Sequence, residues 1–163
     1  MLERLLAGVG LDLLKLCRGE SGRVADIGAA DGDLAFFLEE LGFSVDVIDN
    51  EYTNFNKLDG IRILKKALNS SVTIRSIDLD SRSQLFTEKY GVVFLLGVLY
   101  HLKNPFSILE RLARVARYCF LAHGSPDRPP TACRCISILS PICWDQRNAI
   151  TTIQISGFSQ RKV

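Results

Sequence analysis

A strand–helix–strand pattern between residues 22 and 49 constrains the fold of this chain more than any other feature. VADI (24–27) is a short apolar strand between two glycines, and SVDVID (44–49) is a second strand. Asp33 is expected to cap the helix between them, whose apolar side chains are spaced three or four apart at Leu34, Phe37, Leu38 and Leu41. Two strands joined in this way by short loops favour a parallel pair with a right-handed crossover.

The same alternation continues along the chain. The sequence predicts a helix over 53–68, strands over 72–77 and 91–96, a helix that begins at Asn104-Pro105, and a fifth strand over 118–121. The apolar run GVVFLL is typical of a central parallel strand. Five strands alternating with helices predict a doubly wound, mostly parallel α/β sheet of the Rossmann-like kind.

Composition sets the broad class. The chain has 163 residues, is 47% hydrophobic and has a net charge of +2. This is one ordinary domain, and the charge is too small to indicate nucleic-acid binding by itself. No apolar run is long enough for a membrane span. Residues 1–20 are expected to form an amphipathic helix rather than a signal peptide, which indicates a cytoplasmic protein without a membrane partner.

The loop after the first strand, DIGAADGD (26–33), raises the question of its ligand. A dinucleotide fingerprint needs G-x-G-x-x-G, but here Gly28 and Gly32 enclose Ala29, Ala30 and Asp31. The carboxylates of this stretch would repel a phosphate, and no Lys or Arg offsets them. The loop therefore suits a ligand with an amino group and no phosphate, although a Gly-x-x-x-Gly stretch can also be a simple tight turn.

Acidic residues also follow the second and third strands. In open α/β sheets, ligands bind at the carboxyl ends of the strands. Asp49 can accept hydrogen bonds from both ribose hydroxyls, and Asp78 can accept one from the adenine amine. Taken singly, Asp49 could be a turn former, and Asp78 and Asp80 could be solvated. Together, amino group, ribose and adenine describe S-adenosylmethionine.

These residues and two further stretches resemble class I S-adenosylmethionine-dependent methyltransferases. The family loop reads acidic-x-Gly-x-Gly-x-Gly, from which this chain departs at Ala30. LLGVLYHLKNPFSILERL (95–112) and TNFNKLDGIRILKKAL (53–68) are similar to the transfer-RNA wobble-uridine methyltransferase branch and its uncharacterised relatives. The resemblance covers residues 21–122. It implies a cofactor pocket lined by Asp26, Gly28, Ala29, Ala30, Gly32, Asp49, Asn50, Asp78, Leu79 and Gly97.

The catalytic group is not evident from the sequence. Tyr100 and His101 are the only candidates near the site, and His101 could act as a general base or hold a substrate. The competing interpretation is a histidine bonded to the following loop. Methyl transfer often needs only alignment of the reactants, so a dedicated base is not required. The acceptor, a small molecule, sugar, lipid head group or RNA, stays open, as does the oligomeric state.

Residues 123–163 differ from the rest of the chain. They hold most of the prolines and Cys133, Cys135 and Cys143, which lack a fourth ligand for a metal site. Synonymous codons read in a shifted frame from Ile138 to Arg161 permit PVAYLLGPTECNNDxTNFWIFSE, which resembles the continuation expected in the relatives. We therefore expect a frameshift near Ala122–His123 and a poorly ordered, out-of-frame tail. The alternative is a divergent surface tail.

Three functions remain after these observations. The leading prediction is a methyltransferase domain, impaired by the replaced carboxyl-terminal part, in which the last predicted strand becomes an exposed apolar edge. The second is a catalytically inactive fold that binds a cofactor or a partner. An NAD-type oxidoreductase is disfavoured by the spacing of the glycine loop.

Overall fold

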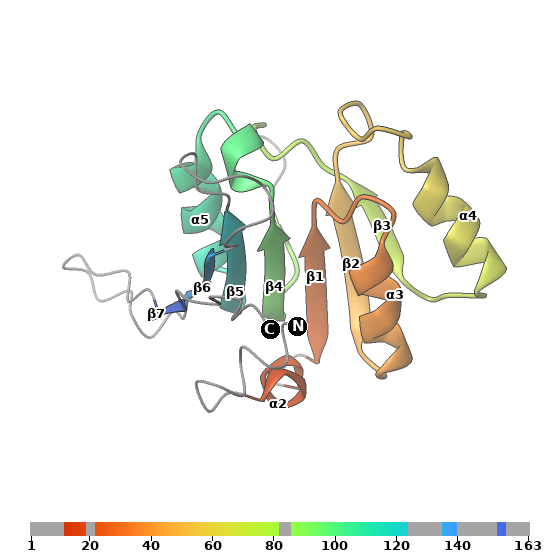
Figure 1. Cartoon of the computed structure of the whole chain (residues 1–163), viewed down its shortest axis with the longest axis horizontal. Coiled ribbons are helices and arrows are strands. Elements are labelled where there is room, and N and C mark those ends of the chain that lie inside the picture. The colour runs from red at the N-terminus through yellow and green to blue at the C-terminus, as the bar shows by residue number, and fades with distance from the viewer. Residues whose placement is uncertain (1–11, 19–21, 82–85, 124–134, 140–152, 156–163) are drawn as a thin grey trace, which may run out of the picture.

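A computed structural model describes residues 12–18, 22–81, 86–123, 135–139 and 153–155. Within them one sheet has the strand order β3-β2-β1-β4-β5-β6-β7. The strands are β1 (Arg23–Ile27), β2 (Ser44–Asp49), β3 (Thr73–Ser76), β4 (Tyr90–Leu96), β5 (Ala116–His123), β6 (Cys135–Leu139) and β7 (Ile153–Ile155). Figure 1 shows β1, β2, β4 and β5 side by side, with their carboxyl ends at one edge.

The sheet is mostly parallel, as predicted. The pairs β1–β2, β1–β4, β2–β3 and β4–β5 are parallel, and all five expected strands are present. The strand order reverses direction between β1 and β4. This topological switch is where open α/β sheets bind their ligands.

Helices cover both faces of the sheet. They are α2 (Leu13–Cys17), α3 (Asp33–Glu40), α4 (Asp59–Ala67), the 3₁₀ turn η1 (Leu99–His101) and α5 (Pro105–Ala113). One buried cluster joins one face of the sheet to side chains of α2, α3 and α4, and a second joins the other face to α5. This two-sided covering explains why the strands are apolar in continuous runs. The α/β, doubly wound prediction is confirmed.

Helix α3 differs from the prediction at both its start and its face. Gly32, in the left-handed conformation with φ 85°, is the N-cap, and Asp33 is the first helical residue. The helix packs on the sheet through Ala35 and Leu38, whereas Phe37 is 52% exposed. Leu41 is also exposed. The buried stripe is therefore centred one position away from the one that the 3–4 spacing of large apolar residues indicated.

Helix α4 begins at Asp59, six residues later than predicted. Residues 50–58 form a series of turns instead, in which Lys57 and Leu58 both have positive φ. Asparagine side chains hold these turns through bonds to backbone N–H groups, an alternative that competes with helix formation.

The ends of the chain are described only in part. From the predicted helix over 1–20, the structure describes 12–18, where α2 buries Leu13 and Cys17. Most of the atypical tail lies outside the described residues. Its strand β6 pairs antiparallel with β5, and β7 pairs with β6. The expectation that β5 is an exposed edge is therefore wrong, because a short strand of the tail covers it.

The amino ends of the strands carry a buried polar network. The side chain of Asp46 is fully buried and accepts hydrogen bonds from Arg23 Nη2 at 2.9 Å and from Tyr90 Oη at 2.8 Å. Arg75 lies 3.4 Å from the same carboxylate, and Glu88 pairs with both arginines. This network ties β1, β2, β3 and β4 together at the end of the sheet opposite to the predicted site. None of the described helices is long and apolar enough to cross a membrane.

Candidate functional site

The structure places the predicted cofactor residues along one edge of the sheet, after four strands. Asp26 is in β1 and Asp49 ends β2, and the other candidates lie in the loops that follow β1, β2, β3 and β4. Tyr100 and His101 are in η1, directly after β4. This edge is at the top of Figure 1, where the loops after β1 and β2 meet.

The loop at Gly28 contacts the segments on both sides of β1, which are β2 and the loop after β4. Its N–H donates to the Ile48 carbonyl of β2 at 2.8 Å. Its φ is 72°, and a Cβ added to it would overlap Cγ2 of Val98, in the loop after β4. Glycine is therefore required here both for its conformation and for the close approach of the two loops.

The middle of the glycine loop has a left-handed backbone conformation at a residue that is not glycine. Ala30 has a φ of 53°, in the left-handed region. Its N–H points to Asp49 Oδ2 at 3.3 Å, so the loop contacts the end of β2. Gly32 then starts α3, and a Cβ on it would overlap Ile61 of α4. An alanine in this conformation adds local strain that a glycine at the same position would avoid.

Asp26 is the most unusual group of the site. Its side chain is 4% exposed, and its Oδ2 has no hydrogen-bond partner in the part of the chain that the structure describes. Burial and, secondarily, the nearby charge of Asp49 raise the pKa of Asp26 to about 7. A buried carboxylate oxygen without a donor is costly to ionise, and a cationic donor would offset that cost.

Asp49 accepts three hydrogen bonds from its surroundings. Its Oδ1 accepts from the N–H of Asn50 at 2.7 Å. Its Oδ2 accepts from Asn54 Nδ2 at 3.0 Å and, more weakly, from the N–H of Ala30. A carboxylate has about four acceptor positions, so one position on Oδ1 remains.

A second asparagine contact joins the loop after β2 to the glycine loop. Asn56 Nδ2 donates to Asp31 Oδ1 at 2.7 Å. This pair packs against Gly60, where a Cβ would lie 2.6 Å from Asn56 Nδ2. Asn54 and Asn56 were not among the residues predicted from the sequence. The signal for them was the asparagines at alternate positions in NFN, a pattern typical of turns.

The loop after β3 is folded by its own aspartates. Asp78 is exposed, and its Oδ1 accepts from the N–H of Asp80 at 3.0 Å. Asp80 Oδ1 in turn accepts from the N–H of Lys103 at 2.9 Å, which links this loop to the start of α5. Leu79 is 8% exposed and belongs to the core cluster on the α5 face. Asp78 is thus exposed at this edge of the sheet, whereas Leu79 is part of the core next to it.

The segment after β4 carries the two catalytic candidates. Gly97 has a φ of 80°, and the Tyr100 hydroxyl would lie 3.6 Å from a Cβ placed there. The rings of Tyr100 and His101 are 4.2 Å apart and tilted by 49°. Both residues are exposed, and within the described residues no hydrogen bond of the His101 imidazole is found. The alternative of a histidine bonded to the following loop is therefore not what this structure contains.

Three carboxylates of the site, those of Asp26, Asp31 and Asp49, have no cationic partner within the described residues. In the same part of the chain, no group of three His, Cys, Asp or Glu side chains could hold a metal ion. The donors around the acids are amides and backbone N–H groups, which are neutral. A diphosphate would meet negative charge without a cation to offset it.

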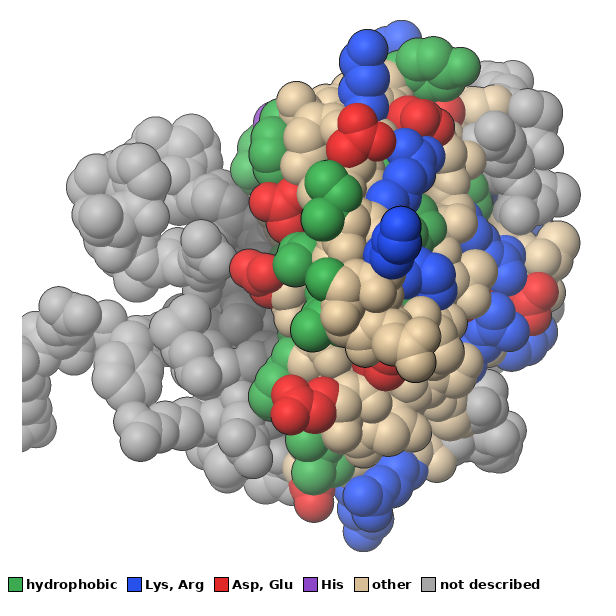
Figure 2. Space-filling model, turned by 90° about the vertical axis from the view of Figure 1, so that its right-hand side faces the viewer, with side chains coloured by type: hydrophobic (Ala, Val, Ile, Leu, Met, Phe, Trp, Pro, Cys, Tyr) green, Lys and Arg blue, Asp and Glu red, His purple; other side chains and the backbone are tan. Residues whose placement is uncertain are grey.

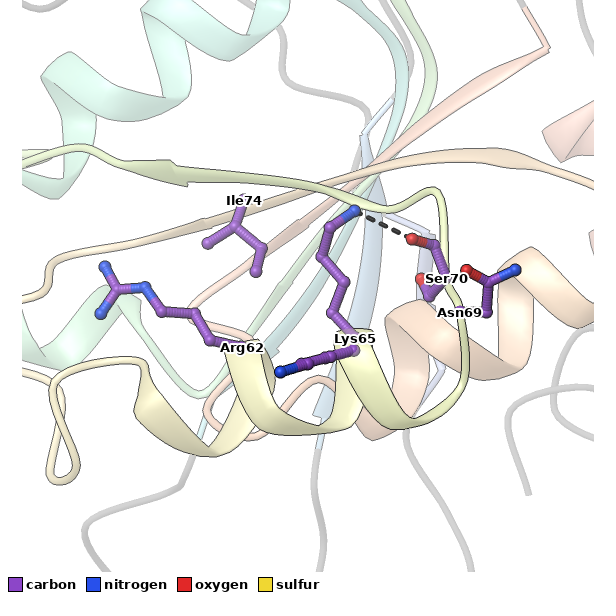
Figure 3. Close-up of a pocket in the computed structure, with 6 residues that line it drawn as sticks. Arg62, Lys65, Asn69, Ser70 and Ile74 are labelled. Atoms are coloured by element: carbon purple, nitrogen blue, oxygen red, sulfur yellow. Dashed lines mark hydrogen bonds between the residues drawn. The ribbon is translucent and has the colours of Figure 1, made fainter.

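A groove of about 440 Å³ lies elsewhere, between α4 and β3, and contains none of the predicted residues. Figure 3 shows its lining: Arg62, Lys65, Lys66, Asn69, Ser70 and Ile74. Lys and Arg side chains gather on this face of the molecule (Figure 2). Two of these cations already bind protein acceptors, because Arg62 pairs with Glu51 at 3.2 Å and Lys65 donates to the Ser70 carbonyl at 3.0 Å.

Comparisons with known proteins establish the fold. No protein-family model and no curated protein matches the sequence. Among solved structures, the N-terminal domain of EvdMO1 with S-adenosylhomocysteine (SAH) bound is 22% identical, with a TM-score of 0.57, over 76% of this chain and 50% of that chain. WbdD, also described as a bifunctional kinase-methyltransferase, is 19% identical, with a TM-score of 0.60, over 77% of this chain and 30% of its own.

A third neighbour is coclaurine N-methyltransferase bound to N-methylheliamine and SAH. It is 18% identical, with a TM-score of 0.55, over 73% of this chain and 35% of that chain. The chain spans about half or less of the length of these three structures. At such identities the likeness concerns the fold, which is the Rossmann-like α/β fold that this chain shares with the three structures.

Proposed function

We propose that this chain binds S-adenosylmethionine and that its fold is a methyltransferase domain. The observation that carries the proposal is the buried Asp26 carboxylate, which lies in β1 at the topological switch and has an acceptor oxygen without a donor among the described residues. SAH-bound neighbours of the same fold support the choice of ligand. SAH is what remains of S-adenosylmethionine after its methyl group has been transferred.

The residues present fit this cofactor. Asp26 would accept from its ammonium group, Asp49 from a ribose hydroxyl, and Asp78 from the adenine amine. The backbone of the glycine loop, with Asn50, Leu79 and Gly97, would form the walls. When bound, the cofactor supplies an electrophilic methyl group on sulfur. Asp26 and Asp49, which form no ion pair within the described residues, favour its positive charge and disfavour the diphosphate of NAD.

The acceptor would approach from the side of η1. The segment 95–112 that carries the resemblance to the wobble-uridine branch comprises the end of β4, η1 and α5, so RNA is one acceptor to test beside small molecules. Tyr100 and His101 are exposed there and are candidates for contact with the acceptor. Alignment of the nucleophile with the methyl group can be sufficient for transfer. We assign no catalytic base.

Titration calorimetry with SAH tests the proposal, with Asp49→Ala as the comparison. We expect the wild-type chain to bind SAH and the variant to bind about 10- to 100-fold more weakly, since hydrogen bonds to charged groups contribute about 1.5–3 kcal/mol. NADH is expected to give no binding. Binding of NADH, or equal affinity of both proteins for SAH, would contradict the proposal.

The second candidate is a fold that binds the cofactor or a partner but transfers nothing. The atypical composition of residues 123–163 favours it, because the part of the chain that follows the cofactor half differs from what the resemblance implies. A labelled-methyl assay on the frame-restored gene product separates the two: transfer supports the enzyme, and SAH binding without transfer supports the second candidate.

A further inference from the structure

The loop after β2 is built around one side chain, Asn54. Its Oδ1 accepts from two backbone N–H groups, those of Asn56 and Leu58, both at 3.1 Å. Because the carbonyl oxygen of the amide is used in this way, its Nδ2 must face the other direction. That direction is Asp49 Oδ2, at 3.0 Å. The orientation of the amide is therefore fixed by the loop itself.

The backbone of this loop is held in a costly conformation. Lys57 and Leu58 have φ values of 55° and 63°. Each such residue costs on the order of 1–2 kcal/mol, and the conformation persists only where its surroundings enforce it. Leu58 is fully buried, and Asn56 fastens the loop to Asp31. The loop that carries Asn54 is thus held by the burial of Leu58 on one side and by the contact of Asn56 with the glycine loop on the other.

The hydrogen bond from Asn54 to Asp49 limits the number of ligand hydroxyl groups from which Asp49 can accept a hydrogen bond. Both acceptor positions of Oδ2 are taken, by Asn54 and by the N–H of Ala30. Oδ1 accepts from the N–H of Asn50 and keeps one position. An amide fixes the carboxylate without cancelling its charge, which an arginine or lysine in the same place would do.

We infer that Asn54 is a positioning residue that makes Asp49 accept a single ribose hydroxyl of the bound nucleoside. The inference rests on the proposed function, because it needs a ribose at Asp49. It predicts that the site distinguishes the 2′- from the 3′-hydroxyl. One deoxy form of SAH should bind at least tenfold more weakly than SAH, and the other within about threefold, since one lost bond to a charged acceptor costs about 1.5–3 kcal/mol.

Asn54→Asp is the sharpest variant. An aspartate keeps the acceptor for the two N–H groups, so the loop retains its turns, but it places an oxygen opposite Asp49 Oδ2. Two carboxylates at this distance repel, and Asp49 leaves its fixed position. We expect tenfold or weaker binding of SAH at pH 8 and loss of the difference between 2′-deoxy- and 3′-deoxy-SAH. Asn69→Asp, the same change at an exposed residue after α4, should alter neither.

A double-mutant cycle separates positioning from a structural role. In an Asp49→Asn background there is no carboxylate to misplace, so Asn54→Asp should change the affinity for SAH less than threefold. An equal loss of affinity in both backgrounds, or unchanged discrimination between the deoxy forms in Asn54→Asp, would overturn the inference. Thermal unfolding of each variant checks that the fold is retained. If the wild-type chain does not bind SAH, the proposed function itself is wrong. If it binds SAH but the variants behave otherwise than expected, only the inference about Asn54 is wrong.

Discussion

At the scale of single residues, the site depends on a carboxylate that the ligand-free fold accommodates poorly. The folded state holds the proton of Asp26 more tightly than the unfolded chain does, with a pKa of about 7 against 3.8. The free energy of unfolding therefore falls as pH rises from about 4 to about 7, by up to about 4 kcal/mol. Above pH 7 the ionised group opposes folding until a cation binds it.

Asp26→Asn tests this conflict between stability and function. An amide of the same shape cannot ionise, so we expect the free energy of unfolding at pH 8 to rise by about 1–4 kcal/mol, with little change at pH 4. The affinity for SAH should fall at least tenfold at pH 8. Urea titrations at both pH values measure the stability. A variant less stable than the wild type at pH 8 would show that Asp26 is satisfied by the protein itself. Asp33→Asn, at an exposed acid nearby, is the control.

Ala30 offers a second test, because it has a conformation that glycine adopts without strain. We expect Ala30→Gly to leave stability unchanged or to raise the free energy of unfolding by up to about 1 kcal/mol, since relief of strain exceeds the added entropy of the unfolded chain. Ala29→Gly, at a neighbour without positive φ, should lower it by about 0.5–1 kcal/mol. Equal losses in the two variants would refute the strain at Ala30.

The acids of the site could be predicted from the sequence, and the amides that hold them could not. Asp26 and Asp49 stand at the ends of apolar strands, and the rule for parallel sheets places such residues together. No such rule applies to Asn54 and Asn56. Asparagine is equally common in solvent-exposed turns, so its presence in the sequence does not indicate a contact with the site. Only the folded loop shows that their donors face Asp49 and Asp31.

At the scale of elements, the strands were predictable because their apolar runs are buried on both faces. The residues at which the helices begin were harder to predict. Glycine in the left-handed conformation, at Gly32, replaced the side-chain cap expected from Asp33. In 53–58, side-chain bonds to the backbone prevailed over the apolar spacing. The pattern also could not indicate the network around Asp46, whose members are distant in sequence.

That network stabilises the sheet at the end remote from the cofactor site. Tyr90→Phe removes the donor to Asp46 and should lower the free energy of unfolding by about 1–3 kcal/mol, because it leaves a buried acceptor less satisfied. The affinity for SAH should change less than twofold. Tyr118→Phe on β5, whose hydroxyl has no hydrogen bond to any described residue, should have little effect on stability or on the affinity for SAH. Urea unfolding and calorimetry compare the two variants.

At the scale of the whole molecule, the predicted cofactor site and the tail lie on different parts of the sheet. The predicted cofactor residues lie in or directly after β1, β2, β3 and β4, while β5 pairs with β6 of the tail along its outer edge. The sequence predicted all five parallel strands, with bounds that differ from the observed ones by at most two residues. It did not predict the antiparallel pairing, because the tail lacks the alternation of strands and helices from which the other elements were read.

The origin of the tail is testable at the level of the gene. We propose that a frameshift near Ala122–His123 changed residues 123–163. Sequencing across these codons in close relatives should reveal a one- or two-base difference, and a labelled-methyl assay with total RNA and with a small-molecule extract should show transfer only by the frame-restored product. A continuous frame in all relatives would argue for a divergent tail instead.

The most direct test of the account is the affinity for SAH between pH 6 and pH 8, measured by calorimetry on the wild type and on Asp26→Asn. If an ionised Asp26 receives the ammonium group, the wild-type affinity should rise about tenfold over this range, in proportion to the ionised fraction of a group with a pKa of about 7. The variant should bind weakly at every pH, without this rise. A wild-type affinity that is independent of pH, or no binding of SAH at all, would contradict the central claim that the acidic strand ends hold an amine-bearing adenosine compound.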